Sequence, residues 1–197
     1  EQMLDILAWA TGPSDHGVVA IRMPGEQILA MERSAGMAFD PSERADAHEP
    51  AVDITGDCPF MRYRIVRPGR EVAVMGLGST MPLAAEVVGR LTDDDGIDAT
   101  LIDALQYSTM DGELLDVLAD GHRVVVTVED GQLEGGWGEK VTAYYANSAN
   151  PKASGVHVLN FGATKEFTDR VPLDELDERY GLTADAVVDR IRRTLSR

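Results

Sequence analysis

The sequence predicts an α/β protein whose main domain is an open, doubly wound, mostly parallel five-stranded sheet with helices on both faces. Two observations support this prediction. Strand-like and helix-like runs alternate from residue 61 to residue 197, which is the order of parallel β-α-β units. The run 124–128, VVVTV, consists of β-branched residues only, which is typical of a strand buried on both faces of a sheet.

The first 24 residues predict one helix and one short strand. Residues 2–10 have apolar side chains at helical spacing, and residues 18–21, VVAI, are typical of a strand. The apolar residues of the predicted helix are Met3, Leu4, Leu7, Ala8 and Trp9. A lone helix and strand cannot bury both of their apolar faces. We therefore interpret residues 1–24 as the tail of a preceding domain, or as a piece that packs on the chain that follows.

Residues 25–60 predict an inter-domain linker, because they contain few sustained apolar patterns and several loop-like stretches. His16 and His48 have no second His or Cys at the spacing of metal ligands. We interpret both as solvated turn residues.

Residues 61–197 form the predicted main domain. Its strands are expected at 62–66, on an edge of the sheet, and at 72–77, 99–102, 124–128 and 156–161. Its helices are expected at about 82–91, 111–118, 139–145, 173–180 and 184–195. Ser79 or Thr80 is expected to cap the first of these helices. The acidic run 93–95 is interpreted as a solvated turn.

The composition limits the classes of function and location. A formal net charge of −16 argues against non-specific binding to nucleic acid or to an anionic membrane, and no apolar run has membrane-spanning length. The single cysteine, Cys58, excludes an internal disulfide framework and favours a reducing cytoplasm. Because the sequence begins at Glu1 rather than Met, we expect a piece of a longer protein.

The first candidate site is the glycine-rich stretch after the central strand. Gly135, Gly136 and Gly138 stand where a helix is expected to begin. Such a start can offer free N–H groups to an anion, or it can let the backbone pack closely on a strand. The spacing matches neither a Walker loop nor the G-x-G-x-x-G pattern. The sequence favours packing, because Glu134 and Glu139 flank the helix start, and leaves the anion site open.

The second candidate site is the pair Glu129 and Asp130, which are predicted to end the central strand and, with Gly131, to form a turn, at the end where open sheets bind ligands. Two such acids more often cap a neighbouring helix or meet solvent, and we favour that interpretation. The sequence shows no Ser–His–Asp set, zinc cluster or calcium loop in recognisable context. We therefore predict no catalytic residue and no metal site in this chain.

Five segments, taken in order, resemble the C-terminal domain of the transketolase superfamily, and most closely its 1-deoxy-D-xylulose-5-phosphate synthase family. They are 78–85 (GSTMPLAA), 127–130 (TVED), 135–138 (GGWG), 160–162 (NFG) and 180–183 (YGLT). The order of the five segments is a stronger signal than any one of them. Residues 1–24 are similar to the last helix and strand of that family's pyrimidine-binding domain.

The resemblance implies that thiamine diphosphate and magnesium lie between the first two domains of the parent enzyme. The third domain, at 61–197 here, would support dimerisation and hold no cofactor. We therefore expect this fragment alone to be inactive, with a homodimer and the missing N-terminal domains as its partners. The implied reaction of the parent condenses pyruvate with glyceraldehyde 3-phosphate, for isoprenoid and thiamine precursor synthesis. Arg22 is the remaining arginine of the family's substrate-phosphate pattern, since Gly25 replaces the next one.

Departures from the family pattern leave other functions open. Asp103 and Asp111 keep two aspartates of the pattern, whereas the neighbouring arginine, lysine and proline are lost. A divergent paralogue, a part of another transketolase-family enzyme, and a regulatory or anion-binding module are the alternatives.

Overall fold

The computed structural model describes residues 2–13, 17–22, 58 and 60–196. Contacts divide the chain into two compact units, Glu1–Arg62 and Tyr63–Arg197. The predicted linker 25–60 lies outside the described residues except for Cys58 and Phe60, and His16 and His48 lie outside them as well.

The first unit contains the predicted N-terminal helix, α1 (Gln2–Ala10). Its exposure differs from the expected pattern, because Trp9 is buried whereas Leu7 is 42% exposed. The predicted strand at 18–21 was wrong: these residues form no strand, and Val18 is fully exposed. A strand requires a hydrogen-bonded neighbour, and none of the residues described here pairs with this segment.

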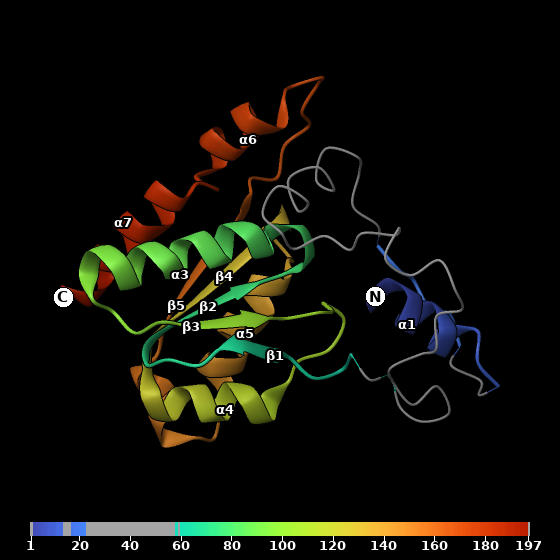
Figure 1. Ribbon diagram of the computed structural model, residues 1–197, viewed down its shortest axis with the longest axis horizontal. Coiled ribbons are helices and arrows are strands. Elements are labelled where there is room, and N and C mark those ends of the chain that lie inside the picture. The colour runs from blue at the N-terminus through green and yellow to red at the C-terminus, as the bar shows by residue number, and fades with distance from the viewer. Residues whose placement is uncertain (1, 14–16, 23–57, 59, 197) are drawn as a thin grey trace. The chain divides into compact units, whose positions relative to one another are not determined.

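The second unit is built on a five-stranded sheet with the order β1-β3-β2-β4-β5 (Figure 1). The strands are β1 (Arg64–Arg67), β2 (Glu71–Gly76), β3 (Thr100–Asp103), β4 (His122–Gln132) and β5 (His157–Ala163). The pairs β2–β3, β2–β4 and β4–β5 are parallel, and only the edge strand β1 runs antiparallel, against β3. This topology confirms the predicted open, mostly parallel sheet and its edge strand.

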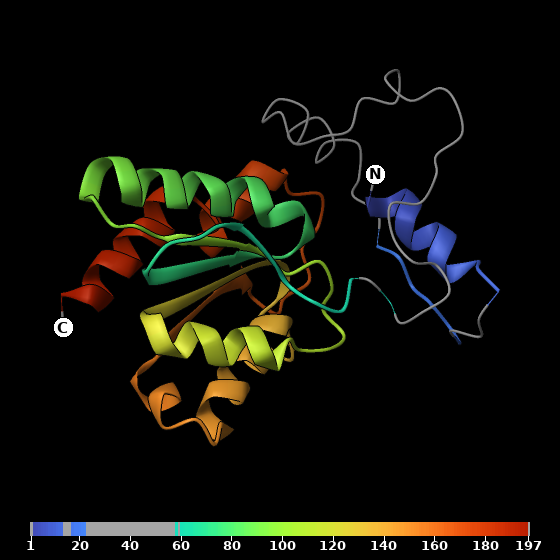
Figure 2. The same cartoon turned by 60° about the horizontal axis from the view of Figure 1, so that its bottom comes forward.

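Helices cover both faces of the sheet, as predicted. One face carries α3 (Met81–Asp95) and α7 (Ala184–Leu195), and the other carries α4 (Gly112–Gly121) and α5 (Trp137–Asn147). Figure 2 shows the sheet between these two layers. A further helix, α6 (Leu173–Tyr180), and two 3-10 helices, η2 (Gly78–Thr80) and η3 (Pro151–Gly155), complete the unit.

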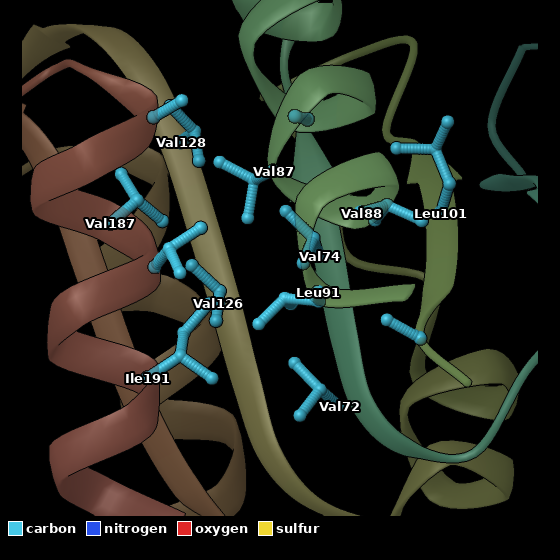
Figure 3. Close-up of a cluster of buried hydrophobic side chains, with 14 of the residues drawn as sticks. Val72, Val74, Val87, Val88, Leu91, Leu101, Val126, Val128, Val187 and Ile191 are labelled. Atoms are coloured by element: carbon cyan, nitrogen blue, oxygen red, sulfur yellow. The ribbon is translucent and has the colours of Figure 1, made fainter. Parts of the chain in front are cut away.

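The two central strands divide their side chains between two cores, because successive residues of a strand point to opposite faces. Val126 and Val128 of β4 lie in the core under α3 and α7 (Figure 3), whereas Val125 lies in the core under α4 and α5. Residues Val124 to Glu129 are all buried. The prediction of a strand buried on both faces is therefore confirmed.

Two boundaries differ from the prediction. β4 continues through Glu129 and Asp130 to Gln132, which pairs with Ala163, so these acids do not form a turn. The acidic run 93–95 is the last turn of α3, which ends at Gly96 with a φ of +68°. Within α4, Leu115 and Leu118 are buried in the core, whereas Val117 is 63% exposed.

His122 lies at the junction of α4 and β4 with both ring nitrogens hydrogen-bonded. Nδ1 lies 3.0 Å from the Leu118 carbonyl oxygen, which can only accept, so this nitrogen carries the proton. Nε2 lies 2.8 Å from the Thr100 hydroxyl and accepts from it. Burial disfavours the charged ring and lowers the pKa of His122 from its usual value of 6.5.

This environment predicts a pH-dependent stability. The unfolded chain takes up a proton near the usual histidine pKa of about 6.5, whereas the folded chain does so only at lower pH. The free energy of unfolding should therefore fall as the pH drops below about 6.5, until the lower folded pKa is passed. Urea unfolding of the wild type and of His122→Gln at a series of pH values measures this. The variant should lose less stability over the same range, and parallel curves would contradict the assignment.

Candidate functional site

The carboxyl ends of β2 and β4 form the candidate site suggested by the topology. From β2 the sheet extends to β3 on one side and to β4 on the other, so the strand order reverses at this point. Open α/β sheets bind ligands in the crevice outside such a reversal. The residues here are Gly76 to Met81 after β2, and Val128 to Trp137 around the end of β4.

The Glu129 carboxylate lies at the N-terminus of α5. Its Oε2 accepts a hydrogen bond from the Trp137 backbone N–H at 3.0 Å, and its Oε1 accepts one from the Gly138 N–H at 2.7 Å. The residue is only 4% exposed. A helix N-terminus has unsatisfied N–H groups and a partial positive charge, both of which a buried carboxylate satisfies. An acid of the chain thus occupies the position that a bound anion would need.

The three glycines allow this close approach. A Cβ on Gly136 would meet the Gln132 carbonyl oxygen and would lie 2.7 Å from the Glu129 Oε1. A Cβ on Gly138 would lie 2.5 Å from the Thr127 hydroxyl oxygen. Gly135 has a φ of +74°, which disfavours other residues, and its N–H donates to the Glu139 carboxylate at 2.8 Å. Close packing is therefore a physical reason for glycine at 136 and 138, and backbone conformation is the reason at 135.

Hydrogen bonds of the chain itself join the residues after β2 to the carboxyl end of β4. The Ser79 hydroxyl donates to the Asp130 carboxylate at 2.7 Å, and the Thr80 hydroxyl donates to the Val128 carbonyl at 2.6 Å. The Leu77 N–H also donates to that carbonyl, at 3.0 Å. Thr80 is the N-cap residue of α3, as predicted, but its side chain makes no capping bond. Its hydroxyl bridges the two strands instead.

A second set of contacts joins the start of the domain to α5. The Trp137 indole N–H donates to the Tyr63 hydroxyl at 3.1 Å, and the two rings meet edge to face. The Tyr63 backbone N–H donates to the Asp111 carboxylate at 2.9 Å. Burial raises the pKa of Tyr63, so its hydroxyl stays protonated. The sequence interpretation missed this cluster, because nothing local links positions 74 residues apart.

The remaining sequence-predicted residues have structural contacts or lie elsewhere. Asp103 is buried and accepts from the Arg64 guanidinium at 2.8 Å, and Asp111 also caps α4 through the Leu114 N–H at 3.2 Å. Arg22 lies in the first unit with an exposed side chain.

Within the described ranges, no three His, Cys, Asp or Glu side chains gather as a metal site would need. None of the helices described is both long and apolar enough to span a bilayer.

Comparison with known proteins identifies related sequences and structures. A family model described as "Transketolase, C-terminal domain" matches residues 62–187. The chain is 30% identical over 139 residues to the 1-deoxy-D-xylulose-5-phosphate synthase of Carboxydothermus hydrogenoformans, covering 71% of this chain and 22% of that protein. The corresponding synthase of Chlorobaculum tepidum is 31% identical over 133 residues, covering 68% and 20%. The chain thus spans about a fifth of the length of these curated relatives.

A solved structure of a split gene transketolase, described as an inactive beta4 tetramer, is also similar. It matches with a TM-score of 0.62 and 27% identity, covering 74% of this chain and 46% of that one. The mostly parallel five-stranded sheet therefore has a counterpart in a protein of known structure.

One added methyl group should have opposite effects on the stability of the protein at Gly136 and at Gly89. Gly136→Ala should lower the free energy of unfolding by about 1–3 kcal/mol, because its Cβ meets backbone and the Glu129 carboxylate. Gly89→Ala is the matched control: Gly89 lies within α3 with open space around its Cβ, so the change should raise stability by about 0.5–1 kcal/mol. Urea unfolding measures both. Equal effects of the two substitutions would contradict a packing role for Gly136.

Proposed function

This chain belongs to the transketolase C-terminal domain family, and we propose that it serves as the C-terminal domain of a 1-deoxy-D-xylulose-5-phosphate synthase-like enzyme. The observation that carries this proposal is the family match over residues 62–187, together with at least 30% identity to two synthases of that name. The reaction belongs to the whole enzyme, because the chain corresponds to about a fifth of those relatives.

The proposed role of this domain is assembly rather than chemistry. Hydrogen bonds from Ser79 and Thr80 join the two strand ends at the reversal, and Glu129 occupies the start of α5. The described residues therefore do not fit thiamine diphosphate, because the diphosphate would compete with a buried carboxylate for the same N–H groups. In the proposed enzyme, preceding domains hold thiamine diphosphate and magnesium, and condense pyruvate with glyceraldehyde 3-phosphate. The single cysteine of this chain favours a cytoplasmic location.

The related split gene transketolase supports this division of labour. Its structure is described as an inactive tetramer, which accords with a part of a transketolase that folds without being active. The alternative of an anion-binding regulatory module has no specific observation in its favour, since the helix start most suited to an anion already has the Glu129 carboxylate.

A chimeric enzyme tests the proposal. Residues 62–197 would replace the matching C-terminal region of the Carboxydothermus synthase, and a truncated synthase without this region is the control. We expect the chimera to bind thiamine diphosphate with magnesium and to release carbon dioxide from pyruvate, and the truncated protein to lose this activity. The chain alone should give no heat when titrated with the cofactor and magnesium. A folded but inactive chimera, or micromolar cofactor binding by the chain alone, would contradict the proposal.

A further inference from the structure

One loop of the second unit exposes an aromatic side chain completely. Residues 164–170, TKEFTDR, join β5 to α6 without forming a helix or strand, and all of them are exposed. Phe167, in the middle of this loop, is fully exposed. In Figure 1 the loop, drawn in orange, extends away from the sheet before it turns back into α6.

The exposure of Phe167 is exceptional within this unit. Single apolar side chains at a surface are ordinary and need no explanation when they are partly covered by their neighbours. The other large hydrophobic side chains described as exposed in this unit are between 46% and 63% exposed; they are Ile65, Val66, Tyr107 and Val117. Phe167 differs from them because no part of its ring is covered by the rest of the chain described here.

The two residues before Phe167 make contacts that position the loop. The Lys165 ammonium lies 2.6 Å from the carboxylate of Glu134, which is in the segment between β4 and α5. The Glu166 carboxylate accepts a hydrogen bond from the Tyr180 hydroxyl, at the end of α6, at 2.7 Å. Surface contacts of this kind contribute little to stability one by one, but these two join the loop to both neighbouring segments. An anchor that is already positioned loses little conformational freedom on binding.

The size of this anchor indicates which kind of partner it fits. Burying one phenylalanine side chain shifts a binding equilibrium about tenfold to a hundredfold. Two separate chains need a factor of about a million, relative to a 1 M standard state, to associate with a micromolar dissociation constant. Phe167 alone is therefore too small an anchor for a partner that diffuses freely. For a domain that the same chain holds nearby, at an effective concentration of about millimolar, a tenfold to hundredfold factor decides between contact and separation.

We propose that the loop 164–170 docks on the domain that precedes this one in the proposed enzyme, with Phe167 inserted into an apolar hollow of that domain. The inference rests on the proposed function and adds the residue through which the two domains meet. The chain spans about a fifth of the length of its curated relatives, so most of such an enzyme is available as this partner. A second copy of the chain fits less well, because each copy has a formal net charge of −16 and free association needs the larger factor.

Trypsin cleavage after Arg170 tests the proposal, measured by mass spectrometry in the chain alone and in the chimera with the Carboxydothermus synthase. Cleavage follows the population of the accessible form, so docking should slow it about tenfold or more in the chimera. Phe167→Ala should raise the rate in the chimera about tenfold, because the anchor is lost, and should leave the rate in the chain alone unchanged. Thr168→Ala is the matched control, since it shortens an exposed neighbour in the same loop and should change neither rate.

The outcomes separate this inference from the proposed function. An active chimera whose loop is cleaved as fast as in the chain alone overturns the inference and does not affect the proposed function. Equal rates in the Phe167→Ala and Thr168→Ala chimeras also overturn the inference. Protection of the loop in the chain alone, as its concentration is raised, would identify a second copy as the partner and would overturn it too. A chimera that folds but is inactive contradicts the proposed function, and this inference with it.

Discussion

The contact between the Glu129 carboxylate and the first N–H groups of α5 organises the carboxyl edge of the sheet. It requires β4 to continue beyond its apolar run, so that position 129 points at the helix start rather than into solvent. It also requires Gly136, because a side chain there would meet Gln132 and the carboxylate itself. The helix then begins with Trp137, whose indole reaches the hydroxyl of Tyr63, the first residue of the domain. One buried acid thus connects the central strand, α5 and the entry of the chain.

Hydrogen bonds of the chain itself occupy the place where open α/β sheets bind ligands. The topology provides a strand reversal between β2 and β4, and the residues there bond to one another. Thr80 bonds to Val128 across the reversal, and Ser79 bonds to Asp130 beside it.

Much of the fold could be predicted from the sequence where local pattern and tertiary environment agree. Residues 124–128 are β-branched and are buried on both faces, and the alternation of strands and helices after residue 61 specified a mostly parallel sheet. The predictions failed where a distant partner decides the conformation. The sequence predicts a turn at Glu129 to Gly131, yet β4 continues to Gln132, which pairs with β5, and the N–H groups of α5 bond to Glu129. Residues 18–21 read as a strand, yet none of the described residues pairs with them.

The central claim is that an internal carboxylate, not a ligand, satisfies the N-terminus of α5. Its most direct test is the chemical shift of the Trp137 and Gly138 backbone amides, measured by NMR while inorganic phosphate or diphosphate is added to the chain. Sodium chloride at equal ionic strength is the reference. The account predicts that both amides shift no more with phosphate than with chloride, because Glu129 keeps their hydrogen bonds. Saturable shifts of these two amides would show that an anion displaces the carboxylate, and would contradict the account.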